Sequence, residues 1–189
     1  MLIDKYLPDY DHIDSNQLII KAPPAKTYSA LWRVDGFNVP WIRALLFIRT
    51  AFERLFKRKN GQVQSTSRFG VADIVAEGSG FQILEEIPGK EFVVGSVGKF
   101  WKPVIDFYPF KPAEFITLKL DGVGKLAWTA IVEPFKEHES IVTMEVRVAL
   151  PDSKSKTMFK FYWKVIGPFS HMMRNRMLNM AKRDAESGN

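Results

Sequence analysis

The chain has 189 residues, of which 46% are hydrophobic and 25% charged, a balance typical of a globular protein and not of a disordered one. It contains no cysteine, which excludes disulfide bonds and thiolate chemistry. Its 27 basic and 21 acidic residues give a net charge of +6, and no uncharged apolar stretch approaches the roughly 20 residues that a membrane-spanning helix needs.

This length fits a single domain over residues 1–189, in which residues 1–14 are expected to form an N-terminal tail. The first residues, Met1–Lys5, lack a basic region followed by an apolar run, so we expect no signal peptide. Together with the absence of cysteine, this favours a cytoplasmic location.

The first third of the chain predicts one strand and then helices. The strand lies within Asp14–Lys21 and stops before two prolines, the second of which suits the first turn of a short helix over Pro24–Trp32. A second helix is predicted over Val39–Phe56, with apolar residues on one face and basic residues, including Arg43, on the other. A further short helix is predicted over Val71–Glu77.

The middle of the chain is strand-like. A Pro-Gly turn at residues 88 and 89 predicts a hairpin, and later turns separate three more apolar runs. The five predicted strands cover residues 80–86, 91–98, 113–120, 124–132 and 141–150, with a proline-rich loop at 102–112. Strands joined in series by short turns form an antiparallel meander, and one of its faces needs a cover.

A long helix is predicted over Asp152–Arg183, as the cover of that sheet. Its apolar stripe recurs in steps of three and four residues over roughly eight turns: Phe159, Tyr162, Trp163, Ile166, Phe169, Ser170, Met173, Met177 and Met180. Gly167-Pro168 interrupts the helix, but the apolar spacing continues beyond it, which predicts a kink and not an end.

The same helix carries the net positive charge. Residues 153–183 contain eight basic residues and no acidic one, whereas the rest of the chain has 19 basic and 21 acidic residues. We interpret the charge first as the solvated side of the helix, with His171 on that side, and as an anionic membrane surface site second. Nucleic acid is the least favoured partner because no recognition motif accompanies the charge.

Several segments resemble the START-like superfamily, and more narrowly a bacterial polyketide cyclase/dehydrase-like branch of unassigned activity. They include Ile19–Leu31, Glu85–Glu91, Gly98–Pro103 and Tyr162–Ser170. The resemblance implies an α+β helix-grip fold, in which a curved antiparallel sheet of six or seven strands grips a long kinked C-terminal helix. Our prediction contains six strands.

The resemblance also implies a cavity between sheet and helix that binds a hydrophobic or amphipathic small molecule, such as a lipid. The candidate lining residues are Tyr28, Trp101, Phe107, Trp128, Tyr162, Phe169 and Met173, with Arg43 and Asp106 as polar candidates. Each aromatic or methionine side chain could equally well be ordinary core packing, which is the commoner role of such stripes.

Glu145 and Arg147 share one face of the last predicted strand, opposite its valines. If the valine face packs inward, the two form a solvated ion pair, which is the interpretation we favour. If both faces of the sheet are covered, the pair could orient a ligand.

Little in the sequence points to catalysis. The three histidines, His12, His138 and His171, form no close pair, so no metal site and no cofactor are predicted. A cyclase- or dehydratase-like enzyme in the same pocket remains the alternative function. It requires a buried titratable group with a shifted pKa, for which Asp106 and Glu145 are candidates.

Overall fold

The computed structural model describes residues 1–34, 71, 75, 79–102, 105–119 and 121–187. Its elements, in chain order, are α1 (Leu2–Tyr6), β1 (His12–Ile20), α2 (Pro24–Arg33), β2 (Phe81–Ile87), β3 (Glu91–Lys99), β4 (Asp106–Phe107), the 3-10 helix η2 (Pro112–Glu114), β5 (Gly124–Lys136), β6 (Glu139–Ala149) and α5 (Ser153–Glu186). Two predicted helices, Val39–Phe56 and most of Val71–Glu77, lie outside the described residues.

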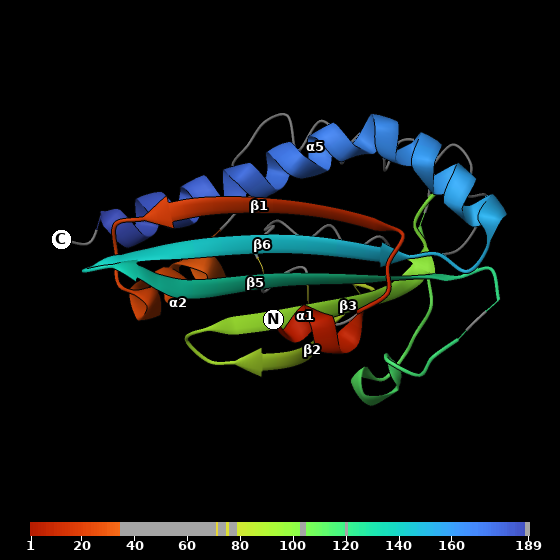
Figure 1. The fold of residues 1–189 in the computed structure, drawn as a ribbon, viewed down its shortest axis with the longest axis horizontal. Coiled ribbons are helices and arrows are strands. Elements are labelled where there is room, and N and C mark those ends of the chain that lie inside the picture. Colours follow the sequence, from red (N-terminus) through yellow and green to blue (C-terminus); the bar gives the residue numbers. More distant parts are fainter. Residues whose placement is uncertain (35–70, 72–74, 76–78, 103–104, 120, 188–189) are drawn as a thin grey trace.

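The strands form one curved antiparallel sheet, over which α5 lies as a long bent helix (Figure 1). The order is β1-β6-β5-β3-β2, and the short β4 pairs with the end of β3. The first strand therefore lies beside the last, with Ile20 opposite Ser140. This is the α+β helix-grip arrangement that the sequence predicts, and the number of strands in the described residues is six.

One of the predicted strands is wrong. Residues 113–119 form the end of η2 and a turn, and the sixth strand is β4 instead. The backbone N–H groups of Phe115 and Leu118 donate to the carbonyls of Pro112 and Glu114, so this segment satisfies itself locally and not through a ladder. Its one fully buried side chain, Phe115, packs against the rings of Tyr6 and Phe110.

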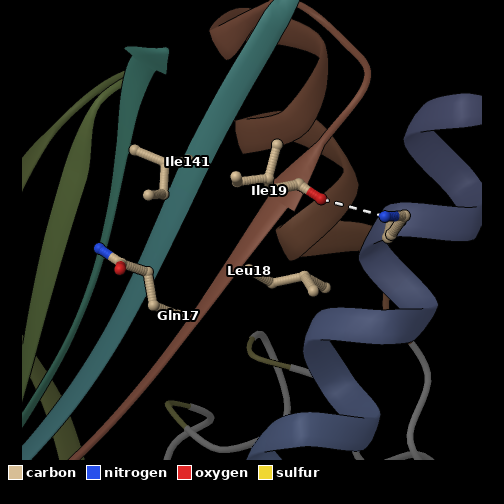
Figure 2. A pocket seen from close by; sticks show the side chains of 5 residues that line it. Gln17, Leu18, Ile19 and Ile141 are labelled. Atoms are coloured by element: carbon tan, nitrogen blue, oxygen red, sulfur yellow. Dashed lines mark hydrogen bonds between the residues drawn. The ribbon is translucent and has the colours of Figure 1, made fainter.

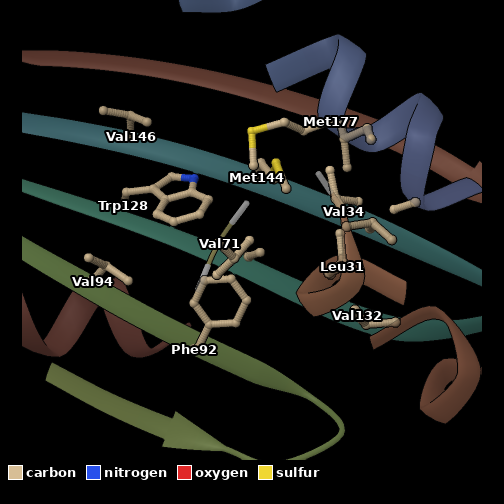
Figure 3. Packing of buried hydrophobic residues seen from close by; sticks show 14 of the residues in the cluster. Leu31, Val34, Val71, Phe92, Val94, Trp128, Val132, Met144, Val146 and Met177 are labelled. Atoms are coloured by element: carbon tan, nitrogen blue, oxygen red, sulfur yellow. The ribbon is translucent and has the colours of Figure 1, made fainter. Parts of the chain in front are cut away.

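Helix α5 begins at a side-chain cap, because Asp152 accepts a hydrogen bond from the backbone N–H of Ser155 at 2.7 Å. It then continues without a break through Pro168 to Glu186, as predicted. With α2 it covers one face of the sheet. The apolar residues between them form the inner cluster, which includes Leu31, Val34, Phe92, Val94, Trp128, Val132, Met144, Val146, Phe159, Met177 and Leu178 (Figure 3).

The opposite face of the sheet is also covered. Helix α1 and the segment around η2 pack there on what we call the outer cluster: Ile3, Tyr6, Leu7, Leu84, Val93, Val97, Phe110, Phe115, Val123 and Ala127. Neighbours in β3 alternate between the clusters, Phe92 facing inward and Val93 outward, as the two-residue period of a strand requires. Both faces of β3 are apolar, so both need a cover.

The predicted N-terminal tail is therefore wrong. Residues 1–14 form α1 and the start of β1, and Ile3 is fully buried in the outer cluster. The backbone N–H of Leu2 donates to the carboxylate of the buried Glu91 at 2.7 Å, which ties α1 to β3.

The same N-terminal segment buries Glu145 and Arg147. Arg147 donates to Glu145 and Asp4, both at 2.7 Å, and to the carbonyl of Leu7 at 3.1 Å. The pair thus lies on the face away from α5, as favoured, but it is buried and not solvated. The sequence pattern correctly places Glu145 and Arg147 on the face of the sheet away from α5. It does not predict that residues 1–14 cover this face.

Candidate functional site

Strand β1 presents alternate residues to α5. His12, Asp14, Asn16, Leu18 and Ile20 lie on this side, whereas Ile13 and Ile19 on the other side are exposed. The α5-facing side of β1 is therefore apolar toward its end and polar toward its start. The polar half meets the middle of α5.

His12 lies among aromatic rings at the polar end of β1. Its ring centroid is 4.4 Å from that of Trp163 and 5.5 Å from that of Phe159, and these two rings stack on each other at 5.4 Å. Tyr162, 6.1 Å from Phe159, extends the group. We call these four side chains the His12 cluster. Phe159 is buried, while Tyr162 and Trp163 remain partly accessible at the edge of α5.

The Nε2 atom of His12 is buried and has no hydrogen-bond partner among the described residues. Burial disfavours the imidazolium and lowers the pKa of His12 from its ordinary value of 6.5, an effect that Asp14 opposes and Arg174 reinforces. The ring is therefore neutral at pH 7. A buried polar atom without a partner needs an explanation, and a polar group on a bound molecule is one.

Next to this cluster, Arg174 crosses from α5 to β1. Its guanidinium donates to Asn16 Oδ1 at 2.7 Å, to Ser170 Oγ at 2.8 Å and to the carboxylate of Asp14. His171 also contacts Asp14, at 3.3 Å, while its side chain stays 48% exposed, so it lies between β1 and the predicted solvated side of the helix. Burial lowers the pKa of Arg174, which the carboxylate of Asp14 counteracts. With every guanidinium nitrogen paired, this network is a brace between helix and sheet.

A second aromatic group lies toward the other end of the inner cluster. Phe92 is its centre, with the rings of Trp32 at 5.0 Å, Trp128 at 5.4 Å and Tyr28 at 6.2 Å. Figure 3 shows the rings of Phe92 and Trp128. The Tyr28 hydroxyl donates to Glu86 at 2.5 Å, and burial together with this bond raises its pKa. Figure 3 also shows Val71, fully buried, beside Phe92 and Trp128. Among the described residues, Val71 and these rings thus occupy part of the space predicted as a cavity.

The structure separates the predicted lining residues. Tyr28, Trp101 and Trp128 are buried in the inner cluster, and Tyr162 packs against it. Phe169, however, is exposed and belongs to neither apolar cluster, contrary to its predicted place on the buried stripe.

The remaining candidates contribute differently. Met173 is partly buried, and Phe107 packs on the ring of Phe81 and directly over Gly80, whose φ of +84° suits a glycine. Asp106 is exposed and pairs with Lys102 at 2.6 Å, so it does not reach the inner cluster. Arg43 lies outside the described residues.

Two hollows lined by described residues lie at the surface and are open to solvent. One is bordered by Tyr28, Ser29, Trp32 and Glu86. The other lies where β1 and β6 meet α5, beside Gln17, Leu18, Ile19 and Ile141, and Lys182 closes it by donating to the carbonyl of Ile19 at 3.1 Å (Figure 2). The first hollow holds the Tyr28–Glu86 hydrogen bond, and the buried Nε1 of Trp32 also lacks a partner among the described residues. We place the candidate site at the His12 cluster, where a buried unpartnered nitrogen adjoins two aromatic rings.

The described part of the chain contains neither a group of metal-ligand side chains nor a helix suited to span a membrane. Within it, no three or more His, Cys, Asp or Glu side chains are grouped as metal ligands. None of its helices combines the length and apolarity needed to cross a bilayer.

The sequence prediction missed His12, Trp163 and Arg174 as neighbours. His12 was assigned to the tail, and Arg174 was counted as part of a solvated charge. The usable signal is the two-residue period His12, Asp14, Asn16, which places three polar side chains on one side of a strand that begins at residue 12.

No protein-family model matches the sequence, and no curated protein matches it significantly. Among solved structures, the chain is similar to a hypothetical protein from Helicobacter pylori, with 10% identity, a TM-score of 0.46 and coverage of 97% of this chain and 94% of that chain. It is also similar to the Zhui aromatase/cyclase from Streptomyces sp. R1128 and to the Aha1 dimer from Colwellia psychrerythraea. Both show 12% identity, a TM-score of 0.41 and coverage of 94% of this chain and 98% of the other. These likenesses are distant, and the fold described above follows from the strand order and helix positions alone.

Proposed function

We propose that the chain binds a hydrophobic or amphipathic small molecule between the N-terminal half of α5 and the start of β1, at the His12 cluster. The observation that carries this proposal is the buried Nε2 atom of His12, which lies beside the rings of Phe159 and Trp163 and has no hydrogen-bond partner in the described part of the chain. Binding sites for such molecules are mostly apolar, with a few placed polar groups that fix the orientation of the ligand.

Each member of the cluster has a role in this proposal. The neutral imidazole of His12 forms one hydrogen bond with a hydroxyl or carboxyl group of the ligand. The partly accessible faces of Tyr162 and Trp163 contact its apolar part. Because the described side chains around Val71 are buried and Tyr162 and Trp163 are partly accessible, we infer that the ligand enters at the edge of α5.

A ligand should therefore copurify with the protein or be replaceable by a probe. We expect native mass spectrometry or solvent extraction to recover an apolar molecule, and a fluorescent fatty acid to bind and be displaced by unlabelled fatty acid. His12→Leu and Trp163→Ala should weaken probe binding at least about tenfold, the cost of one buried hydrogen bond or aromatic contact.

The matched control is His138→Asn, because His138 is exposed in the turn between β5 and β6 and has a positive φ that asparagine tolerates. Equal probe affinity in His12→Leu, Trp163→Ala and this control would contradict the proposal.

Catalysis in the same place is the alternative, and the lowered pKa of His12 is the observation that favours it. A neutral histidine near pH 7 can act as a general base. A cyclase- or dehydratase-like enzyme would return the extracted ligand in altered form after incubation. A binding protein would return it unchanged.

The proposal includes two broader expectations from the sequence. The chain acts as a single domain over residues 1–189, for which limited proteolysis should yield no stable fragment that lacks either α1 or α5. It works in the cytoplasm, which fractionation of cells expressing it would test.

A further inference from the structure

Helix α5 carries an exposed apolar row along its length. Five large side chains recur in steps of three and four residues, the spacing that places residues on one side of a helix: Met158, Phe161, Val165, Phe169 and Met172. Phe161 is 66% exposed and Val165 is 64% exposed, so the row does not belong to the hydrophobic core. An exposed contiguous apolar patch marks an interaction site more often than scattered residues do.

The row points away from the sheet. Phe159 and Gly167 are buried, and each lies two positions from the exposed Phe161 or Val165. Two positions correspond to a rotation of about 200° around the helix axis, close to the opposite side. The inner cluster and the exposed row are therefore back to back on one helix.

Basic residues continue the row at both ends. Lys154 precedes Met158 by four residues, and Arg176 follows Met172 by four. The whole row, from Lys154 to Arg176, is about 33 Å long at 1.5 Å per residue. Lys164 lies alongside, with its ammonium 5.9 Å from the centre of the Phe161 ring.

Some cations of α5 are paired within the described part of the chain and others are not. Lys156, Arg174 and Lys182 form ion pairs with carboxylates of described residues. By contrast, the described part of the chain provides no ion pair for five exposed cations on α5: Lys154, Lys160, Lys164, Arg176 and Arg183. No acidic residue occurs between 153 and 183 to neutralise them.

We propose that this row docks α5 flat on the surface of an anionic lipid bilayer. The five apolar side chains enter the headgroup and acyl boundary, while the flanking cations contact lipid phosphates, the arrangement of interfacial amphipathic helices. Charge complementarity selects this partner. A second copy of the chain would bring two basic rows together, and like charges repel. The docking does not depend on small-molecule binding at the His12 cluster.

Vesicle co-sedimentation tests the docking. We expect the protein to sediment with vesicles of phosphatidylcholine mixed with phosphatidylglycerol, and much less with phosphatidylcholine alone. Raising the ionic strength from about 0.01 M to about 1 M shortens the Debye length from about 30 Å to about 3 Å, so binding should fall at least about tenfold.

The apolar and the basic parts are tested by separate variants. Phe161→Glu with Val165→Glu, and Lys154→Glu with Arg176→Glu, should each reduce binding to the anionic vesicles at least about tenfold. The matched controls are Phe135→Glu, at an exposed apolar residue of β5, and Lys90→Glu with Lys111→Glu, at exposed cations outside α5. Both controls should bind like the parent protein.

Three outcomes would overturn the proposal: no preference for anionic vesicles, an equal loss in the control variants, or a dimer in light scattering that Phe161→Glu with Val165→Glu dissociates. The last would make a second copy the occupant of the row. Probe binding without vesicles is measured on the same variants. The substituted side chains lie outside the His12 cluster. A loss of probe binding would therefore count against the small-molecule site alone, and not against membrane docking.

Discussion

At the scale of single residues, His12 links the candidate site to solution pH. Burial lowers its pKa below 6.5, so the unfolded chain takes up a proton that the folded protein resists. The free energy of unfolding is therefore unaffected by this group above pH 6.5 and falls as the pH drops below it.

We expect His12→Gln to flatten the dependence of unfolding free energy on pH between about 7 and 5.5, measured by urea denaturation. Parallel pH profiles for the parent and His12→Gln would show that His12 titrates freely in the folded protein.

Arg174 makes a prediction about stability. Removing its side chain leaves Asp14 and Asn16 without their buried partner, and breaking such a pair costs on the order of 3 kcal/mol. Urea unfolding should show this loss for Arg174→Ala. Arg176→Ala, two residues later and exposed, should change the stability by less than about 0.5 kcal/mol. A similar small effect at both positions would mean that the network is not a brace.

Residue roles were only partly predictable. The burial of Tyr28 and Trp128 could be predicted from periodicity, because each lies on the apolar face of its helix or strand and that face packs into the core. Phe169 could not be placed in this way. Its spacing fits both the buried apolar stripe of α5 and the exposed apolar row, and only the packing of the folded protein shows that it is exposed. His12 required the correct start of β1, which sequence patterns locate poorly.

At the scale of elements, the Gly167-Pro168 step in α5 has a packing role. A Cβ atom at position 167 would lie 2.7 Å from Nε1 and 2.9 Å from Cδ1 of Trp163, so the glycine makes room for the indole. The interruption that the sequence shows thus supports the geometry of the His12 cluster.

Gly167→Ala should therefore destabilise the protein by about 1–3 kcal/mol, the usual cost of overpacking. In an unconstrained helix the same change stabilises by up to about 1 kcal/mol. Thermal unfolding gives the sign, and tryptophan fluorescence should report a displaced Trp163. Stabilisation without a spectral change would contradict the close contact.

Helix α1 is short but is expected to matter for stability. Ile3→Ala removes a fully buried side chain from the outer cluster and should cost about 2–5 kcal/mol in urea unfolding. Ile13→Ala, at a residue that is 42% exposed on β1, is the matched control and should cost far less. Equal effects would mean that α1 is only loosely attached.

Most elements could be predicted from the sequence because their periodicity is long or their turns are distinctive. Helix α5 spans more than nine turns' worth of residues at 3.6 per turn, and the turn at Gly89 fixes the β2–β3 hairpin. The wrong predictions concern short segments. Residues 113–119 were expected in a strand but form the end of η2 and a turn, and the five residues of α1 carry too little pattern to distinguish a helix from a tail.

At the scale of the whole molecule, the sheet is a layer between two apolar clusters, with α5 as the cover of one of them. A ligand at the edge of α5 binds the folded state alone and must stabilise it. At about 100 times its dissociation constant the gain is about 2.7 kcal/mol, which corresponds to a rise of roughly 5–11 °C in the melting temperature of a chain this size.

This rise should be visible in circular dichroism melting curves with the fatty acid that displaces the probe. It should be about half as large or smaller in Trp163→Ala, because tenfold weaker binding leaves a gain of about 1.4 kcal/mol at the same ligand concentration. The melting temperature of each protein without ligand is its reference. An equal rise in both proteins would place the bound molecule elsewhere.

The pairing of β1 with β6 also sets the order in which the chain can fold. Ile20 lies opposite Ser140, about 120 residues later, so β1 has no partner until almost the whole sheet has been synthesised. At about 5–20 residues per second, a ribosome needs roughly 6–24 s to bridge that interval. The hairpin β2–β3 can form during this time, whereas β1 waits and α5 arrives last. Such distant pairing favours slow folding, and it leaves the nascent β1 as a substrate for chaperones.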